Sequence, residues 1–153
     1  MSASSSSSGC TYSPAGTELW RTDGTVRGTS RVADINKGSG SSNPANFISL
    51  SNYLYFSATD TILNFGRRLY RISENNSMEI EVINKINYNA TNSLQSAVEI
   101  ENYDPIDLTI FSKDQIFFSA YDNYFGRELC FINSSSSSPD TSIQVYNYIC
   151  IFN

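Results

Sequence analysis

Aspartate and glutamate are the residues that this chain offers for acid–base or metal chemistry, because it contains no histidine and only three cysteines. The lack of histidine removes every imidazole base and the commonest transition-metal ligand. Cys10, Cys130 and Cys150 form no C-x-x-C pair, so neither a zinc site nor a thioredoxin-like site is expected. The sequence also has no Gly-x-Ser-x-Gly elbow, P-loop or dinucleotide fingerprint. It therefore predicts a protein that is not an enzyme and that binds no cofactor.

Two aspartates, Asp60 and Asp122, each follow a Phe-Ser-Ala stretch and are the candidates for a calcium site. Calcium needs about six to eight oxygen ligands, and no dense Asp/Asn loop surrounds either residue. The simpler interpretation is a turn at the end of a strand, in which the carboxylate accepts backbone N–H groups. Asp23, which precedes Gly24, is likewise most simply a turn former, with calcium binding as the alternative.

The three cysteines are disulfide candidates, and in an oxidising compartment an odd count leaves one for an intermolecular bond. Buried free thiols at Cys130 and Cys150 are the alternative. Asn75, Asn89 and Asn133 begin Asn-x-Ser/Thr sequons and are glycosylation candidates. Together with a surface rich in Ser, Asn and Thr, these features favour an extracellular or cell-surface location.

Charge and hydropathy exclude two classes of partner. The net charge is −5, and no basic patch with interleaved aromatic residues is present, so the chain is not expected to bind nucleic acid. No apolar run approaches the ~18 residues that membrane insertion requires. Residues 1–15 are rich in serine and are predicted to form an arm, with no basic region or apolar stretch typical of a signal peptide.

The segment 16–35, GTELWRTDGTVRGTSRVADI, is predicted to be a β-hairpin. Leu19 alternates with Glu18 and Trp20, and Asp23-Gly24 is a dipeptide that tolerates the positive φ of a tight turn. Period-2 patterns predict further strands at 45–50, 52–60, 66–72, 78–86, 106–111, 115–122, 126–132 and 142–152, and a short helix is predicted at 93–101.

Several of these segments resemble one another. LYFSATD (54–60) matches IFFSAYD (116–122), while GTELW (16–20), GRRLY (66–70) and GRELC (126–130) align in turn. The spacing predicts an all-β fold of tandem antiparallel repeats of about 50–60 residues, arranged as propeller-like blades in a partial or open propeller. The β-repeat domain spans 16–153, in units 16–72, 73–132 and a partial unit 133–153. The expected repeat core comprises Leu19, Trp20, Leu54, Phe56, Leu69, Tyr70, Phe117 and Leu129.

The segment ELWRTDGT (18–25), followed by Gly28-Thr29 and VADI (32–35), resembles the ELWxxDGT repeat family. The loop GSGSSNP (38–44) and the strand LYFSA (54–58) also fit the pattern of that family. The second and third copies keep the strand but lack the Asp-Gly-Thr turn. The resemblance implies tandem, propeller-like β-units in secreted or surface proteins, and it implies no catalytic residues.

The chain begins and ends within a unit, so unpaired strand edges are expected. The final strand is the predicted assembly edge, through Val145, Tyr146, Tyr148, Ile149 and Ile151. The expected partners are copies of the chain itself or a larger repeat protein, and an open head-to-tail contact would give a filament. Arg67 and Arg127 are expected to pair with Glu18 and Glu128 or with backbone carbonyls between units.

The alternative function is a lectin-like or adhesive module that binds glycans or calcium. Trp20, Tyr70 and Cys130 share one position in the repeat, where core packing competes with an exposed sugar-stacking platform.

Overall fold

The computed structural model describes residues 2–3, 16–61, 66–74, 79–85, 104–122, 126–133 and 147–151. These residues form eleven strands and no helix, which confirms the predicted all-β class. None of the described residues belongs to a helix long and apolar enough to cross a membrane. The helix predicted at 93–101 lies outside the described residues. The strands are β1 (Ser2–Ala3), β2 (Glu18–Arg21), β3 (Ser30–Ala33), β4 (Ala45–Leu50), β5 (Tyr53–Asp60), β6 (Gly66–Ser73), β7 (Ile80–Lys85), β8 (Ile106–Ser112), β9 (Gln115–Asp122), β10 (Gly126–Asn133) and β11 (Asn147–Ile151).

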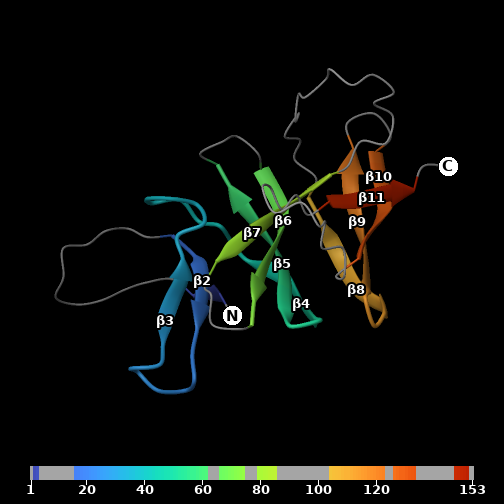
Figure 1. Cartoon of the computed structure of the whole chain (residues 1–153). Coiled ribbons are helices and arrows are strands. Elements are labelled where there is room, and N and C mark those ends of the chain that lie inside the picture. Colours follow the sequence, from blue (N-terminus) through green and yellow to red (C-terminus); the bar gives the residue numbers. More distant parts are fainter. Residues whose placement is uncertain are drawn as a thin grey trace, which may run out of the picture.

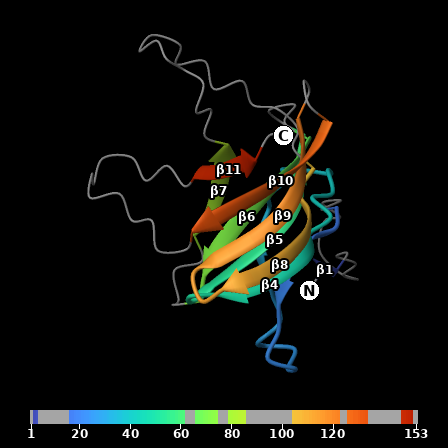
Figure 2. The same cartoon turned by 90° about the vertical axis from the view of Figure 1, so that its right-hand side faces the viewer.

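The strands form three antiparallel groups that follow one another along the chain (Figure 1). The first sheet has the order β1-β2-β3, and the other eight strands form one hydrogen-bonded series, β4-β5-β6-β7-β11-β10-β9-β8. We call its two antiparallel halves the central sheet (β4 to β7) and the third sheet (β8 to β11). A short parallel pairing of β11 with β7 joins the central and third sheets at one side. Figure 2 views the structure from the side of the third sheet, with β9 and β10 lying in front of β5 and β6. Among the described residues no sheet closes on itself.

The central sheet is covered on both faces, as the burial of its side chains shows. Side chains alternate between the two faces of a strand, so a strand covered on one face is buried at every second residue. In β5 the four consecutive residues Tyr55–Ala58 are all buried. Tyr55 packs in a core with the third sheet, and Phe56 packs in a core with Leu19 of the first sheet.

Two cores therefore separate the three sheets. The core between the first and central sheets contains Leu19, Phe56, Ala58 and Tyr70. The rings of Phe56 and Tyr70 stack there at 5.7 Å between centroids. The core between the central and third sheets contains Tyr55, Leu69, Ile83, Ile116, Phe118, Ala120, Cys130 and Ile132.

The third sheet is covered on one face only. In β9, buried Ile116, Phe118 and Ala120 alternate with more exposed residues, as one covered face requires. Phe117 is half-buried on the opposite face, and Leu129 is 51% exposed there. The prediction of Leu129 as a core residue is therefore wrong, because no described sheet lies against the face on which it stands. Of the other predicted core residues, Leu19, Phe56, Leu69 and Tyr70 are buried, whereas Trp20 and Leu54 are half-buried.

The predicted assembly edge has a different place in the sheet. β11 lies between β10 and β7 and is not at an edge. Ile149 and Ile151 pair with β10, and Tyr148 pairs with Lys85 of β7. Val145 and Tyr146 lie outside the described residues. The predicted units 16–72 and 73–132 each combine strands from two sheets.

Cys130 is disulfide-bonded, so it is not the free thiol that the alternative interpretation allowed. Its partner in the strand register is Cys150, which lies directly opposite on β11. Cys10 lies outside the described residues. The serine-rich arm is described only at Ser2–Ala3, which pair with β2.

Leu69 and Leu129 provide a test of the one-sided third sheet, since both follow a glycine by three residues and differ mainly in burial. We expect Leu69→Ala to lower the free energy of unfolding by about 2–5 kcal/mol, because it removes a buried side chain and leaves a cavity. Leu129→Ala should cost less than about 1 kcal/mol, because the side chain is half exposed in the native state. Urea unfolding of the two variants measures both values. Equal losses of stability would show that Leu129 is buried in the folded monomer.

Candidate functional site

The Asp-Gly-Thr segment forms a closed loop between β2 and β3. The hairpin is confirmed, since β2 pairs with β3 antiparallel, but the connection spans residues 22–29 and is longer than a tight two-residue turn. Asp23 Oδ1 accepts the backbone N–H of Thr25 at 2.9 Å and its hydroxyl at 2.8 Å. Thr25 Oγ1 accepts the N–H of Gly28 at 2.9 Å, and Thr29 donates its hydroxyl to the Thr25 carbonyl at 2.7 Å.

The Asp and Gly residues of this loop each have a structural use. Gly24 has φ of +92°, which favours glycine. A Cβ atom at Gly28 would overlap the carboxylate of Asp23, so the loop requires glycine there as well. The two hydrogen bonds from Thr25 lower the pKa of Asp23 from its ordinary value. The side chain of Asp23 thus acts as a turn former.

Glu18 is buried, and three donors satisfy its carboxylate. Its oxygens accept the N–H of Ile35 at 2.9 Å, the N–H of Ser42 at 3.0 Å and the hydroxyl of Ser42 at 2.7 Å. These bonds tie the segment that runs from the first sheet to the central sheet against β2. One of the two predictions paired the arginines Arg67 and Arg127 with Glu18 and Glu128. Among the described contacts, Glu18 instead binds this segment.

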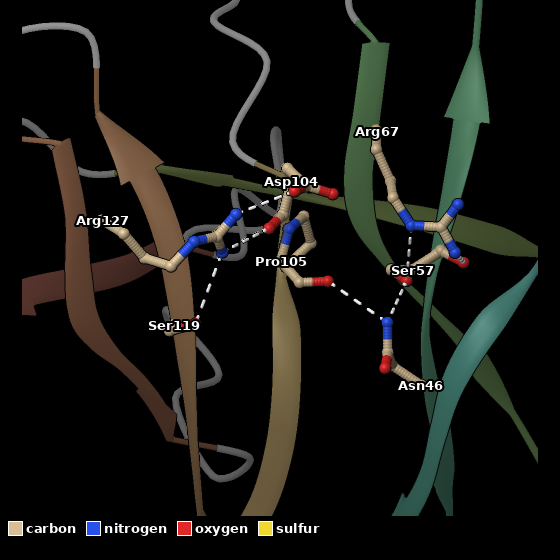
Figure 3. Close-up of polar contacts among 7 residues, drawn as sticks. All are labelled: Asn46, Ser57, Arg67, Asp104, Pro105, Ser119 and Arg127. Atoms are coloured by element: carbon tan, nitrogen blue, oxygen red, sulfur yellow. Dashed lines mark hydrogen bonds and ion pairs between the residues drawn. The ribbon is translucent and has the colours of Figure 1, made fainter.

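Arg67 and Arg127 instead contact the backbone carbonyls of Asn43 and Asp104. Each carbonyl lies in the same predicted unit as its arginine, and not between units as the other predicted pairing had it. Both arginines follow the first glycine of their strands, β6 and β10, and Figure 3 shows their side-chain contacts. Arg67 donates to Ser57 Oγ at 3.0 Å and to the Asn43 carbonyl at 2.9 Å. Arg127 donates to the Asp104 carbonyl at 3.0 Å and to Ser119 Oγ at 3.4 Å.

The charge environments of the two arginines differ. Arg127 forms an ion pair of 2.8 Å with the Asp104 carboxylate, and both side chains are substantially exposed. Burial lowers the pKa of Arg67, and the nearby charge of Asp104 partly opposes this effect. The pKa of an arginine is so high that Arg67 stays charged at neutral pH.

The segments that these arginines hold are equivalent. Asn43-Pro44-Ala45-Asn46 leads into β4, and Asp104-Pro105-Ile106-Asp107 leads into β8. In both, the first and fourth residues have positive φ: 44° and 55° in the first segment, 38° and 56° in the second. Asn and Asp tolerate this left-handed region better than other side-chain-bearing residues. We refer to residues 43–46 and 104–107 as the two Asn/Asp-Pro segments.

The Asn/Asp-Pro segments also connect consecutive sheets through the backbone. The N–H of Asn43 donates to the Thr17 carbonyl at 3.1 Å, and the N–H of Asp104 donates to the Arg67 carbonyl at 3.1 Å. Thr17 and Arg67 are equivalent, since each follows the glycine that begins the segment GTELW (16–20) or GRRLY (66–70). The same hydrogen bond therefore joins the first sheet to the central sheet and the central sheet to the third.

Sequence reasoning missed these segments. Their signal was present as two Asn/Asp-Pro-x-Asn/Asp patterns 61 residues apart, close to the offset of 62 between the Phe-Ser-Ala strands. Asn46 adds a side-chain contact between the sheets, because its amide donates to Ser57 Oγ at 2.9 Å and to the Pro105 carbonyl at 3.4 Å (Figure 3). Its counterpart Asp107 is exposed.

The outer face of the third sheet carries a group of exposed or half-buried apolar side chains. Phe117 contacts Phe111 edge-on at 4.7 Å between ring centroids and Phe131 at 5.8 Å. Phe111 is 68% exposed, and Tyr121 and Leu129 are also exposed. We call the set Phe111, Phe117, Tyr121, Leu129 and Phe131 the outer apolar face. Exposed apolar side chains gathered on one face are typical of an interaction surface.

The calcium candidates lie at the ends of two different hairpins. Asp60 and Asp122 pair with Gly66 and Gly126 at the ends of their hairpins. Among the described residues, no group of three or more Cys, Asp or Glu side chains could hold a metal ion. Asn133 is exposed at the end of β10, where its side chain accepts a hydrogen bond from Gln115. Asn75 and Asn89 lie outside the described residues.

At the repeat position shared by Trp20, Tyr70 and Cys130, Tyr70 is a core residue and not part of an exposed sugar-stacking platform. It is buried between the first and central sheets, with the guanidinium of Arg68 at 5.9 Å from its ring centroid. Burial raises the pKa of Tyr70, and the charge of Arg68 offsets part of the rise. Trp20 is half-buried, and Cys130 is fully buried.

Comparison with protein-family models, with curated proteins and with solved structures finds no match for this chain. The resemblance to the ELWxxDGT repeats stays a prediction.

The hydrogen bonds of Asp23 give a pH-dependent test. A carboxyl whose folded pKa is lowered stabilises the fold above its unfolded pKa, and this stabilisation is lost as the pH falls through the folded pKa. Thr25→Ala removes the hydroxyl donor and keeps the N–H donor, so we expect the pKa of Asp23 to rise toward its ordinary value. Thr25→Ser keeps both donors and should leave the pKa of Asp23 low. An NMR titration of the Asp23 carboxyl measures this difference, and identical pKa values in the three proteins would contradict the hydroxyl contact.

Proposed function

We propose that the chain is a non-catalytic structural module of tandem β-units. It assembles with copies of itself or with a larger scaffold, and the contact uses a sheet face. The units are propeller-like blades of which this chain holds an open series. The observation that carries the proposal is the outer apolar face, because the equivalent face of each preceding sheet is covered by the next sheet.

The burial of three equivalent leucines supports this interpretation. Leu19 is 3% exposed, Leu69 is 2% exposed and Leu129 is 51% exposed. The next sheet covers the first two, while no described sheet covers the third. A face that is built like two covered faces and is left open fits a module to which a further element adds.

The tandem, blade-like interpretation has further support in the sheet topology. The central and third sheets have the same strand order along the chain, and β4 and β8 each carry a register shift after the Asn/Asp-Pro segment. The arginine contacts and the inter-sheet hydrogen bonds also recur. A location outside the cell is part of the proposal, and the disulfide of Cys130 supports it.

Two measurements test the proposal together: the binding of an apolar dye and the mass of the protein in solution. We expect the dilute wild-type protein to bind the dye 8-anilinonaphthalene-1-sulfonate and to associate as its concentration rises. Leu129→Asp should reduce both dye fluorescence and association, because it places a charge in the outer apolar face. Val26→Asp is the matched control, since Val26 is 94% exposed in the β2–β3 loop and belongs to neither core. If dye binding and mass were the same in the wild type and Leu129→Asp, the proposed function would be wrong.

A further inference from the structure

The three sheets stack with a fixed direction. Leu19, Leu69 and Leu129 lie at equivalent positions of β2, β6 and β10. Leu19 and Leu69 both point toward the sheet that follows in the chain, since each belongs to the core shared with that sheet. The next residue of a strand lies on the opposite face. Each sheet therefore has a leucine face and a reverse face.

The same contact between these two faces occurs twice. Tyr70, which follows Leu69, belongs to the core that buries Leu19. Cys130, which follows Leu129, belongs to the core that buries Leu69. The residue after the leucine in one sheet thus helps to cover the leucine of the preceding sheet.

Two positions in this series lack a counterpart among the described residues. Leu129 is half exposed on the leucine face of the third sheet. Trp20 follows Leu19 as Tyr70 follows Leu69, so alternation along β2 assigns it to the reverse face of the first sheet, at a point where the pairing of β2 with β3 shifts register. Trp20 is half-buried. Its indole Nε1 is inaccessible to solvent and has no hydrogen-bond partner among the described residues.

We propose that a second copy of this chain covers the outer apolar face, with Trp20 of the second copy set against Leu129 of the first. This inference rests on the proposed function, since it names the partner of the same face. The contact continues the interfaces already present in the chain, with Trp20 in the role of Tyr70 and Cys130. It joins two different faces, so copies add head to tail, and they form a filament unless the rotation closes a ring.

The backbone of the third sheet also fits this arrangement. Thr17 and Arg67 use their carbonyl oxygens to accept an N–H from the following sheet. Arg127 is the third residue of this series, and its side chain already holds the Asp104 segment of its own sheet. A docked sheet would meet a strand that begins with Gly-Arg-x-Leu, as β6 does.

Mixing two variants tests whether the contact joins unlike faces. Leu129→Asp blocks the leucine face, and Trp20→Asp blocks the reverse face. We expect each variant alone to sediment as a monomer, and an equal mixture to form a 1:1 pair of twice the monomer mass and nothing larger. The pair forms because one variant supplies an intact Trp20 and the other an intact Leu129.

Controls keep this test independent of folding. Circular dichroism establishes that each variant is folded, and Trp20→Ala replaces Trp20→Asp if the latter unfolds. Trp20→Ala should weaken self-association by at least about tenfold, because large aromatic side chains dominate such interfaces. Val26→Asp should associate like the wild type.

Two results would overturn the inference. If Trp20→Asp alone associates like the wild type, the outer apolar faces pair with each other in a symmetric dimer. If the mixture stays monomeric, a second copy is not the partner. In the latter case the proposed function still stands, provided that the wild-type protein binds the dye and Leu129→Asp does not.

Discussion

Each sheet of this chain has apolar side chains that only another sheet can cover. Leu19 is buried because Phe56, Ala58 and Tyr70 of the central sheet lie against it, and Leu69 is buried in the same way by the third sheet. Non-directional burial of this kind provides the main favourable free energy of the fold. Leu129, the last leucine of the series, is half exposed, because no described sheet covers the outer apolar face of the third sheet.

Polar contacts then determine how one sheet sits on the next. Burial alone would allow the sheets to slide, whereas hydrogen bonds require defined geometry. The N–H groups of Asn43 and Asp104 donate to carbonyls of the preceding sheet, and Arg67 and Arg127 hold the backbone around them. Positive φ at these Asn and Asp residues turns the chain into the first strand of each four-stranded sheet.

The strands and the equivalence of β5 with β9 and of β6 with β10 could be predicted, because alternating apolar residues and Phe-Ser-Ala stretches are local signals. The exposure of Leu129 could not, since burial depends on which sheet lies opposite and not on the residue itself. The Asn/Asp-Pro segments were missed because β4 and β8 share little sequence, and the likeness is confined to Pro44 and Pro105, just before these strands, and their flanking residues. The place of β11 between β10 and β7 depends on a pairing between distant parts of the chain, which strand patterns do not specify.

Hydroxyl-radical footprinting of the dilute protein tests most directly the claim that each sheet face is buried by its successor. Mass spectrometry of the digested protein gives the oxidation rates of Leu19, Leu69 and Leu129 in one sample, so residue type and radical dose are matched. The account predicts rapid oxidation of Leu129 and strong protection of Leu19 and Leu69. Equal rates at the three leucines would contradict it.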